Sequence, residues 1–278
     1  MRVLILGGNG FIGSNLVTLL ADDAKYEMFA ASRRTGLDLT DYQCTKNYFS
    51  GLNPDIIVNL AAHTGSIHYV TAYAAEVIRD NIMMPLNLYR IIADLCPSAK
   101  VIIVLSNCSY PGEAELQKES EWLNGEVHPS ILAYGSAKRA LYALSRCYGT
   151  QYGIVTANLL VPNVYGPGDH VDPQKTHALN GMIMRMIKTK REQKSEFEVW
   201  GTGMPVREWI YVADIAAIIK RVLDHTIELS YPVNIAQKKG WSIKETAEII
   251  ADILEYKGAI RFNTSYADGA MKKILDNT

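Results

Sequence analysis

The chain has 278 residues, of which 48% are hydrophobic and 21% are charged, and its formal net charge at pH 7 is −1. This composition is ordinary for a globular protein of one large or two modest domains. The balanced charge gives no reason to expect nucleic-acid binding, and no apolar run reaches the roughly 18 residues that a membrane span needs.

The first fourteen residues, MRVLILGGNGFIGS, contain the most informative motif. An apolar run at residues 3–6 ends in glycines, and a helical pattern starts at once. Gly8, Gly10 and Gly13 fit GxGxxG, whereas Gly7, Gly10 and Gly13 fit GxxGxxG. Glycines between a strand and a helix let the backbone approach a pyrophosphate at the helix N-terminus, which is typical of dinucleotide-binding folds. A structural turn that binds nothing is the alternative interpretation.

Strand and helix signals alternate through the first two thirds of the chain. We predict strands at 27–32, 56–60, 101–105 and 154–160, and helices at 72–95 and 131–148, with a kink or a break at Pro85. Continuous apolar, β-branched runs between helices indicate a parallel sheet covered on both faces. The predicted fold is therefore α/β, a doubly wound parallel sheet of Rossmann type, with a smaller C-terminal domain.

The pattern changes after residue 161. Residues 162–176 are rich in Pro, Gly and Asp, and a basic helix is predicted at 182–194. Residues 206–223 suggest a return to the main domain. A helix at 241–256 opens with a capping box, Ser242 and Glu245. We expect residues 1–165, with 206–235, to form the dinucleotide-binding domain, and 166–205 and 236–278 to form the substrate-binding domain.

Four cysteines are scattered through the chain without CxxC spacing, at Cys44, Cys96, Cys108 and Cys147. This argues against a metal site or a disulfide framework and favours a reducing cytoplasm. Because the N-terminus enters a core strand directly, we expect no cleaved signal peptide.

Tyr134 and Lys138 are four residues apart and fall on one face of a predicted helix. A tyrosine is a weak acid at neutral pH, and a cation one turn away favours its phenolate, so we expect Lys138 to lower the pKa of Tyr134. Ser106, at the end of the preceding strand, would donate a hydrogen bond to a substrate carbonyl. A solvated helix face and a satisfied strand-end hydroxyl are the alternative interpretations.

These motifs resemble the extended short-chain dehydrogenases/reductases through GGNGFIG, LSNCSYP, YGSAK and PNVYGPGD. Residues 61–90, LSNCSYP, GPGDHVDPQKTHALNGMIMR and VWGTGMPVREWIYVADIA narrow the resemblance to the GDP-L-fucose synthase family. That family epimerises and then reduces GDP-4-keto-6-deoxy-mannose. Asn107 and Ser109 depart from its usual pattern. Family members usually continue beyond residue 278, so we expect either a substrate domain that is incomplete at its C-terminus or a shorter relative.

The resemblance implies that Ser106, Tyr134 and Lys138 form the reductase triad, and that Cys108 and His177 form the acid/base pair for epimerisation. The chemistry is reasonable in itself, because a 4-keto group acidifies the protons on the flanking carbons. Inverting such a carbon needs one group to remove a proton and another to return it, and thiols and imidazoles titrate near neutrality. A buried cysteine and a surface histidine are the alternative interpretations.

Cofactor choice depends on the end of the second predicted strand, where Ser32-Arg33-Arg34 stands in place of a carboxylate. Guanidinium groups bind a 2′-phosphate, so we expect NADP(H) rather than NAD(H), with a solvated arginine pair as the alternative. The resemblance implies the following cofactor-binding residues: Gly7, Gly10, Phe11, Ile12, Gly13, Arg33, Asp38, Leu39, Ala61, Tyr134, Lys138 and Asn163.

The resemblance is the main basis for predicting the substrate and the residues that bind it. It implies a nucleotide diphosphate sugar, GDP-linked, with a homodimer formed through the helices at 72–95 and 134–148. The implied substrate-binding residues are Ser106, Asn163, His177, Arg185, Trp200 and Arg207. A GDP-deoxyheptose epimerase/reductase, a pure 4-reductase, a nucleotide-sugar 4-epimerase or dehydratase that recycles NAD, and a regulatory NADP-binding protein remain alternatives.

Overall fold

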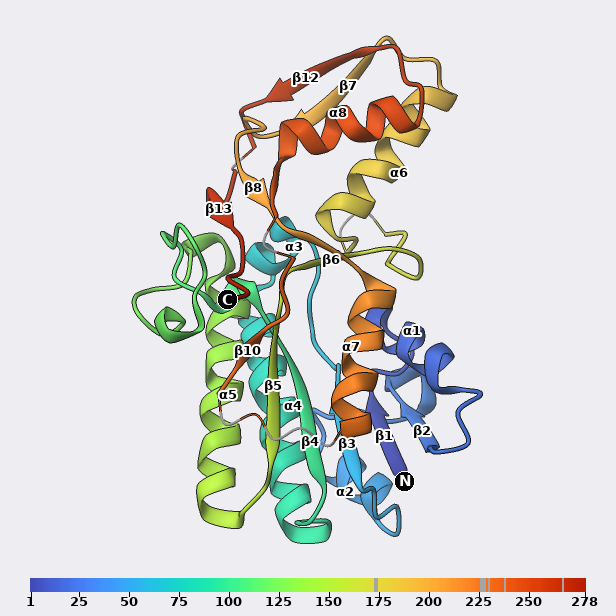
Figure 1. Ribbon diagram of the computed structural model, residues 1–278, viewed down its shortest axis with the longest axis vertical. Coiled ribbons are helices and arrows are strands. Elements are labelled where there is room, and N and C mark those ends of the chain that lie inside the picture. Colours follow the sequence, from blue (N-terminus) through green and yellow to red (C-terminus); the bar gives the residue numbers. More distant parts are fainter. Residues whose placement is uncertain (173–174, 226–228, 230, 238, 267) are drawn as a thin grey trace.

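The computed structural model describes residues 1–172, 175–225, 229, 231–237, 239–266 and 268–278. Its centre is a six-stranded sheet in the order β10-β5-β4-β3-β1-β2, and every neighbouring pair is parallel (Figure 1). This confirms the predicted doubly wound sheet. The strands are β1 (Arg2–Leu6), β2 (Glu27–Ala31), β3 (Ile56–Asn59), β4 (Lys100–Ser106), β5 (Thr156–Val161) and β10 (Val233–Asn234).

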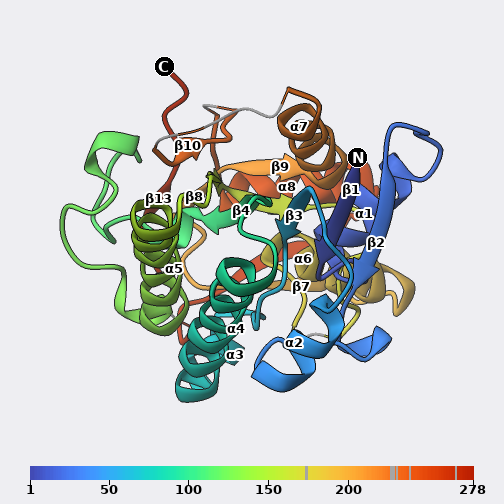
Figure 2. The ribbon, with the colours of Figure 1, turned by 90° about the horizontal axis from the view of Figure 1, so that it is seen from below.

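Helices cover both faces of this sheet (Figure 2). Alternate residues of β1 show why: Leu4 and Leu6 join one buried cluster with α4 and α5, whereas Val3 and Ile5 join another with α1 and α7. A strand whose two faces are both apolar can be buried only in this way. The helices around the sheet are α1 (Phe11–Leu20), α2 (Tyr42–Phe49), α3 (Ile67–Ala72), α4 (Ala74–Leu95), α5 (Leu132–Tyr152) and α7 (Val212–His225).

A smaller unit lies beyond the carboxyl ends of the strands, at the top of Figure 1. It has its own apolar cluster, in which Met186 and Phe197 are buried with Ala247 of a second helix. Its elements, and the short strands that join it to the main sheet, are β6 (Asn163–Tyr165), α6 (Ala178–Arg191), β7 (Glu196–Trp200), β8 (Val206–Arg207), β9 (Trp209–Tyr211), β11 (Trp241–Ser242), α8 (Ile243–Ile253), β12 (Ala259–Asn263) and β13 (Lys272–Lys273). Four short 3-10 turns lie at Arg33–Thr35, Asn107–Ser109, Glu119–Glu121 and Pro129–Ile131.

Several predicted boundaries were wrong for identifiable reasons. The helix predicted from residue 241 begins at Ile243, because Ser242 is its N-cap and Trp241 pairs with Arg207 in β8. The predicted capping box of Ser242 and Glu245 is confirmed. The helix predicted to end at 148 continues to Tyr152, where Gly153 in the left-handed conformation ends it. The predicted basic helix at 182–194 is α6, which begins four residues earlier and ends at Arg191.

Pro85 and the segment 206–223 were both singled out in the sequence. Pro85 lies inside α4, which runs through it without interruption in the secondary structure. Of the segment 206–223, α7 covers the main sheet, whereas β8 joins a separate three-stranded sheet with β11 and β13. Within the described residues, no helix is both long enough and apolar enough to cross a membrane.

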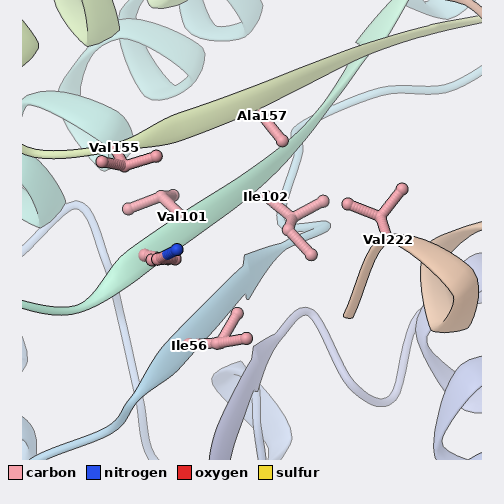
Figure 3. A pocket seen from close by; sticks show the side chains of 7 residues that line it. Ile56, Val101, Ile102, Val155, Ala157 and Val222 are labelled. Carbon is pink, nitrogen blue, oxygen red and sulfur yellow. The ribbon is translucent and has the colours of Figure 1, made fainter. Parts of the chain in front are cut away.

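A small hollow opens at the amino-terminal ends of the central strands (Figure 3). It lies at the opposite end of the sheet from the glycine cluster and is lined almost entirely by aliphatic side chains. Its lining residues offer no acid/base pair, so this hollow is not a candidate active site. They are Ile56, Lys100, Val101, Ile102, Val155, Ala157 and Val222.

Candidate active site

The glycine cluster forms a tight turn between β1 and α1. Gly7 has a φ of +78°, and a Cβ there would lie 2.8 Å from the backbone nitrogen of Ala61. A Cβ on Gly13 would lie 2.2 Å from the carbonyl oxygen of Gly7, so only glycine lets the helix approach the turn so closely. Gly10 caps α1 without a side-chain hydrogen bond, which leaves the backbone N–H groups at Phe11 and Ile12 directed at the space in front of the helix.

The end of β2 lies beside this turn. The Ser32 hydroxyl donates a 2.6 Å hydrogen bond to the side-chain oxygen of Asn9, which joins the glycine turn to the next strand. Arg33 follows, with a side chain that is 58% exposed and 3.5 Å from Asp38. A second carboxylate, that of Asp80, lies 3.8 Å from the same guanidinium. Arg33 is thus placed for a phosphate group, although two carboxylates already partner it.

The other residues expected to bind cofactor lie nearby in different environments. Asp38 accepts hydrogen bonds from both the backbone and the hydroxyl of Thr40. Burial opposes its ionisation, but these bonds and Arg33 hold the pKa of Asp38 below its usual value. Leu39 is a buried core residue, so its side chain packs into the protein and only its backbone could face a ligand.

The predicted reductase residues meet at the carboxyl end of β4. Lys138 is 6% exposed; its Nζ donates a 2.9 Å hydrogen bond to the carbonyl of Val104 and lies 5.5 Å from the ring centre of Tyr134. Burial lowers the pKa of Lys138 to about 8. Burial also raises the pKa of Tyr134, the neighbouring Cys108 raises it further, and a hydrogen bond with Thr64 opposes the rise.

The expected lowering of the Tyr134 pKa by Lys138 is therefore wrong. Desolvation of the phenol exceeds any effect of the lysine, whose ammonium is bound to a backbone carbonyl instead. A neutral Tyr134 is the form that can donate a proton, which is what reduction of a carbonyl needs.

Cys108 lies in the 3-10 turn that follows β4, and its backbone N–H donates to the Ser106 hydroxyl oxygen at 3.2 Å. Its Sγ accepts a 3.3 Å hydrogen bond from Nζ of Lys273. Burial raises the pKa of the thiol, but the charge of Lys273, hydrogen bonds with Ser106 and Lys273 and the charge of Arg207 outweigh it, so the pKa of Cys108 is lowered.

Gly135 explains how α5 reaches this turn. A Cβ at Gly135 would lie 2.6 Å from the carbonyl oxygen of Cys108, so the absence of a side chain lets the helix touch the turn. Tyr134 is therefore held next to Cys108 by the residue that follows it in the sequence.

His177 is fixed by a carboxylate. Its Nδ1 lies 2.8 Å from Oδ1 of Asp169, and its backbone N–H donates to Oδ2 at 3.0 Å. Asn180 donates to the same carboxylate at 2.7 Å. Burial opposes ionisation of Asp169, yet these bonds hold its pKa well below the usual range. The His177 ring lies 5.6 Å from that of Phe11, which places it against the glycine turn.

Arg185 and Trp200 come together in the smaller unit. The guanidinium lies 4.1 Å from the Trp200 ring centre and donates a 3.0 Å hydrogen bond to the carbonyl of Glu198. Trp200 also stacks on Tyr266, with ring centres 4.9 Å apart, and contacts His68 of α3 edge-on. This cluster joins the smaller unit to the segment that follows β3.

Arg207 and Asn163, also expected to bind substrate, lie where the two units meet. Arg207 donates to the carbonyls of Val206 and Asp268, and burial lowers its pKa. The side-chain amide of Asn163 donates to the carbonyl of Glu208, which follows Arg207 in the chain. Its amide nitrogen is therefore committed to the protein backbone.

Sequence reasoning missed several residues of this site. Asp169 could have been found, because an Asp in Gly-Pro-Gly-Asp eight residues before the predicted His177 is a reasonable partner for it. Lys273, Thr64, Tyr266 and His68 carried no local signal. Within the described part of the chain, no group of three or more acidic, His or Cys side chains could hold a metal ion.

Comparisons with known proteins agree with this geometry. The profile of the NAD dependent epimerase/dehydratase family matches residues 3–236. A GDP-L-fucose synthase from Escherichia coli is 30% identical over 286 aligned residues, covering 100% of this chain and 88% of that protein.

Two solved structures share the fold. A GDP-L-fucose synthetase from Naegleria fowleri bound to NADP is 26% identical with a TM-score of 0.84, covering 99% of this chain and 85% of that chain. A GDP-6-OMe-4-keto-L-xylo-heptose reductase from C. jejuni is 23% identical with a TM-score of 0.88, covering 99% and 89%. The family match spans the glycine turn, the Ser106–Tyr134–Lys138 cluster and β10. The chain therefore belongs to the NAD dependent epimerase/dehydratase family.

Proposed function

We propose that the protein is an NADPH-dependent epimerase and reductase of a nucleotide-linked 4-keto-6-deoxy sugar, and specifically a GDP-L-fucose synthase. The observation that supports this best is the position of Cys108, which lies in the turn beside Ser106 and packs with Tyr134 against one buried cluster. A simple ketone reductase needs a proton donor but has no use for a thiol with a lowered pKa. The name of the E. coli relative supports the same substrate.

The residues around the glycine turn and the end of β2 fit NADP(H). The open N-terminus of α1 would receive the pyrophosphate, and Arg33 would bind the 2′-phosphate that distinguishes this cofactor. The NADP bound to the Naegleria enzyme supports this choice over NAD(H). When bound, the cofactor supplies the hydride. Lys138, with a pKa of about 8, would hold the ribose and orient Tyr134, which burial keeps protonated.

Epimerisation would use Cys108 and His177 on a carbon next to the keto group. One removes a proton, and the electron pair moves to the carbonyl oxygen; the other returns a proton from the opposite face. The lowered pKa of Cys108 suits proton removal. His177, with Nδ1 bound to a carboxylate, keeps Nε2 for proton transfer. Ser106 would donate to the 4-keto oxygen, and Tyr134 would protonate that oxygen once reduction begins.

The nucleotide part of the substrate would lie against the smaller unit. Arg207 and Arg185 would bind the diphosphate, and Trp200, 37% exposed, offers an aromatic surface for the base or sugar. Asn163 would contribute near the sugar through its remaining oxygen. The names of the relatives support GDP as the nucleotide.

We further propose roles for the two domains, a homodimeric assembly and a cytoplasmic location. Residues 1–165 with 206–235 would bind the cofactor, and 166–205 with 236–278 would bind the substrate. We propose a homodimer through the outer faces of α4 and α5, where Ile82 and Met83 are exposed apolar residues. All four cysteines are free thiols, which suits the reducing cytoplasm.

The proposal is tested by product analysis. The full chain is incubated with GDP-4-keto-6-deoxy-mannose and either NADPH or NADH, and the product is assigned by NMR. NADPH consumption with inversion at C3 and C5 is expected. A product reduced at C4 without inversion would leave a pure 4-reductase. Preferential turnover of a GDP-deoxyheptose would identify that sugar as the substrate instead. Conversion without net cofactor consumption would indicate a 4-epimerase or dehydratase that recycles NAD.

A further inference from the structure

The C-terminal strand β13 brings a lysine to the predicted epimerisation thiol from 165 residues away in the sequence. β13 runs parallel to β8, and Lys273 stands opposite Arg207 in that pairing. Lys273 is only 8% exposed. Two cationic side chains are therefore held side by side on neighbouring strands, next to the turn that carries Cys108.

The backbone around Lys273 is fixed on both sides. The N–H of Glu208 donates to the carbonyl of Lys273 at 3.1 Å, and the Glu208 carboxylate accepts the N–H of Leu275 at 2.8 Å. Gln117 donates its backbone N–H to the carbonyl of Ile274 at 2.9 Å. Because these bonds immobilise the strand, the ammonium reaches Sγ of Cys108 from a defined position rather than as a mobile surface lysine.

Neighbouring lysines differ sharply in their partners. Lys272 is 40% exposed at its side chain and lies 3.3 Å from the carboxylate of Glu115, an ordinary surface ion pair. Among the residues described, no carboxylate forms an ion pair with Lys273, whose polar partner is the sulfur of Cys108, 3.3 Å away. A buried ammonium needs a counter-charge, and a thiolate supplies one.

We propose that Lys273 is a positioning residue that keeps Cys108 in the thiolate form required for epimerisation. In the catalytic step of the proposed function, on which this inference rests, the carbon–hydrogen bond breaks, its electron pair moves to the carbonyl oxygen, and the proton joins the sulfur. The pair then changes from thiolate–ammonium to thiol–ammonium. Lys273 neither touches the reacting carbon nor transfers the proton.

Other charged and titratable groups surround Cys108 and Lys273. From β8, Arg207 adds a second positive charge that lowers the Cys108 pKa. Tyr134 and Lys138 lie on α5, and the charge of Cys108 acts to raise the pKa of each. His128 also faces the two cations: burial and the charges of Lys273 and Arg207 lower its pKa, whereas the charge of Glu113 acts to raise it.

The test measures the thiol directly and needs neither substrate nor cofactor. The rate of Cys108 alkylation by iodoacetamide is followed against pH by peptide mass spectrometry, in the full chain and in Lys273→Met, Lys273→Arg and Lys272→Met. The exposed Cys147 is the internal reference in every sample. The Lys273→Met profile should move to higher pH by about one unit, with alkylation at pH 7 slowed several-fold.

Lys273→Arg should restore most of the shift, and Lys272→Met, which removes a charge from the adjacent position, should leave the profile in place. An unchanged profile in Lys273→Met, with Cys147 and the thermal midpoint also unchanged, would overturn the proposal. Equal shifts in Lys272→Met and Lys273→Met would also overturn it, because a general loss of charge would then suffice. Since no sugar is present, a shifted profile in a protein without epimerase activity would reject the proposed function alone.

Discussion

The Oδ1 atom of Asp169 lies 2.8 Å from Nδ1 of His177, and this carboxylate is almost completely buried, with a side-chain exposure of 4%. The ionised carboxylate selects the tautomer in which Nδ1 carries a proton, and it leaves Nε2 for the substrate. The imidazole proposed to act in epimerisation is therefore oriented by a carboxylate within the protein itself.

Asp169→Asn should slow epimerisation by about 10- to 100-fold, because a neutral amide holds the imidazole less firmly and no longer fixes its tautomer. The measurement is deuterium exchange from solvent into the keto sugar with the oxidised cofactor present. Thr176→Val is the matched control, since it removes a weaker 3.2 Å bond to the same carboxylate. Exchange at the wild-type rate in Asp169→Asn would contradict the role of the pair.

Tyr134→Phe should reduce hydride transfer by at least about 100-fold while leaving solvent exchange into the sugar largely intact. In the proposed mechanism, the phenol donates a proton only in the reductive step, and Cys108 and His177 act before it. Cofactor oxidation is followed optically, and exchange is followed by mass spectrometry. If both activities fall together while cofactor binding persists, Tyr134 is needed for more than protonation of the 4-oxygen.

Arg33→Ala should weaken NADPH binding about 10- to 100-fold and NADH binding far less, because a guanidinium–phosphate bond is lost only for NADPH. Titration calorimetry with both cofactors gives the two affinities. Arg79→Ala is the control, since Arg79 is an exposed arginine that pairs with Asp80, one of the two carboxylates near Arg33. Equal losses for the two cofactors would reject Arg33 as the phosphate ligand.

Lys138→Met should inactivate the enzyme and stabilise the fold at neutral pH by up to about 3 kcal/mol. The pKa of Lys138 is about 8 in the folded protein and about 10.4 when unfolded, so between these values the unfolded chain binds more protons. Stability of the wild-type protein therefore rises with pH across this window.

The advantage of the Met variant should shrink over the same window. Chemical denaturation at several pH values from 7 to 10.5 would measure it. A difference in unfolding free energy that does not change with pH would show that burial does not perturb this lysine.

Features encoded within a few neighbouring residues were predictable. The glycine turn, the Tyr134–Lys138 spacing and the capping box at Ser242 each depend on one turn or one helix face, and the structure has them where the sequence placed them. The alternation of apolar strands and helices was sufficient to predict the parallel sheet.

Features that depend on burial or on distant pairing were not predictable. The sequence suggests that Lys138 acidifies Tyr134, but it cannot show that both groups are desolvated, and desolvation decides the direction of the shift. Lys273 lies on a strand of only two residues, too short to leave a periodic pattern. Its contact with Cys108 is created by the pairing of β13 with β8.

The central claim, that one site both inverts and reduces the sugar, is tested most directly by one incubation in deuterated water. GDP-4-keto-6-deoxy-mannose and NADPH are supplied to the wild-type protein and to Cys108→Ser, with cofactor oxidation followed optically and ring deuterium by mass spectrometry. The single-site mechanism predicts NADPH consumption with deuterium at two ring carbons for the wild-type protein, and loss of that deuterium in Cys108→Ser. NADPH consumption by the wild-type protein without ring deuterium would contradict it.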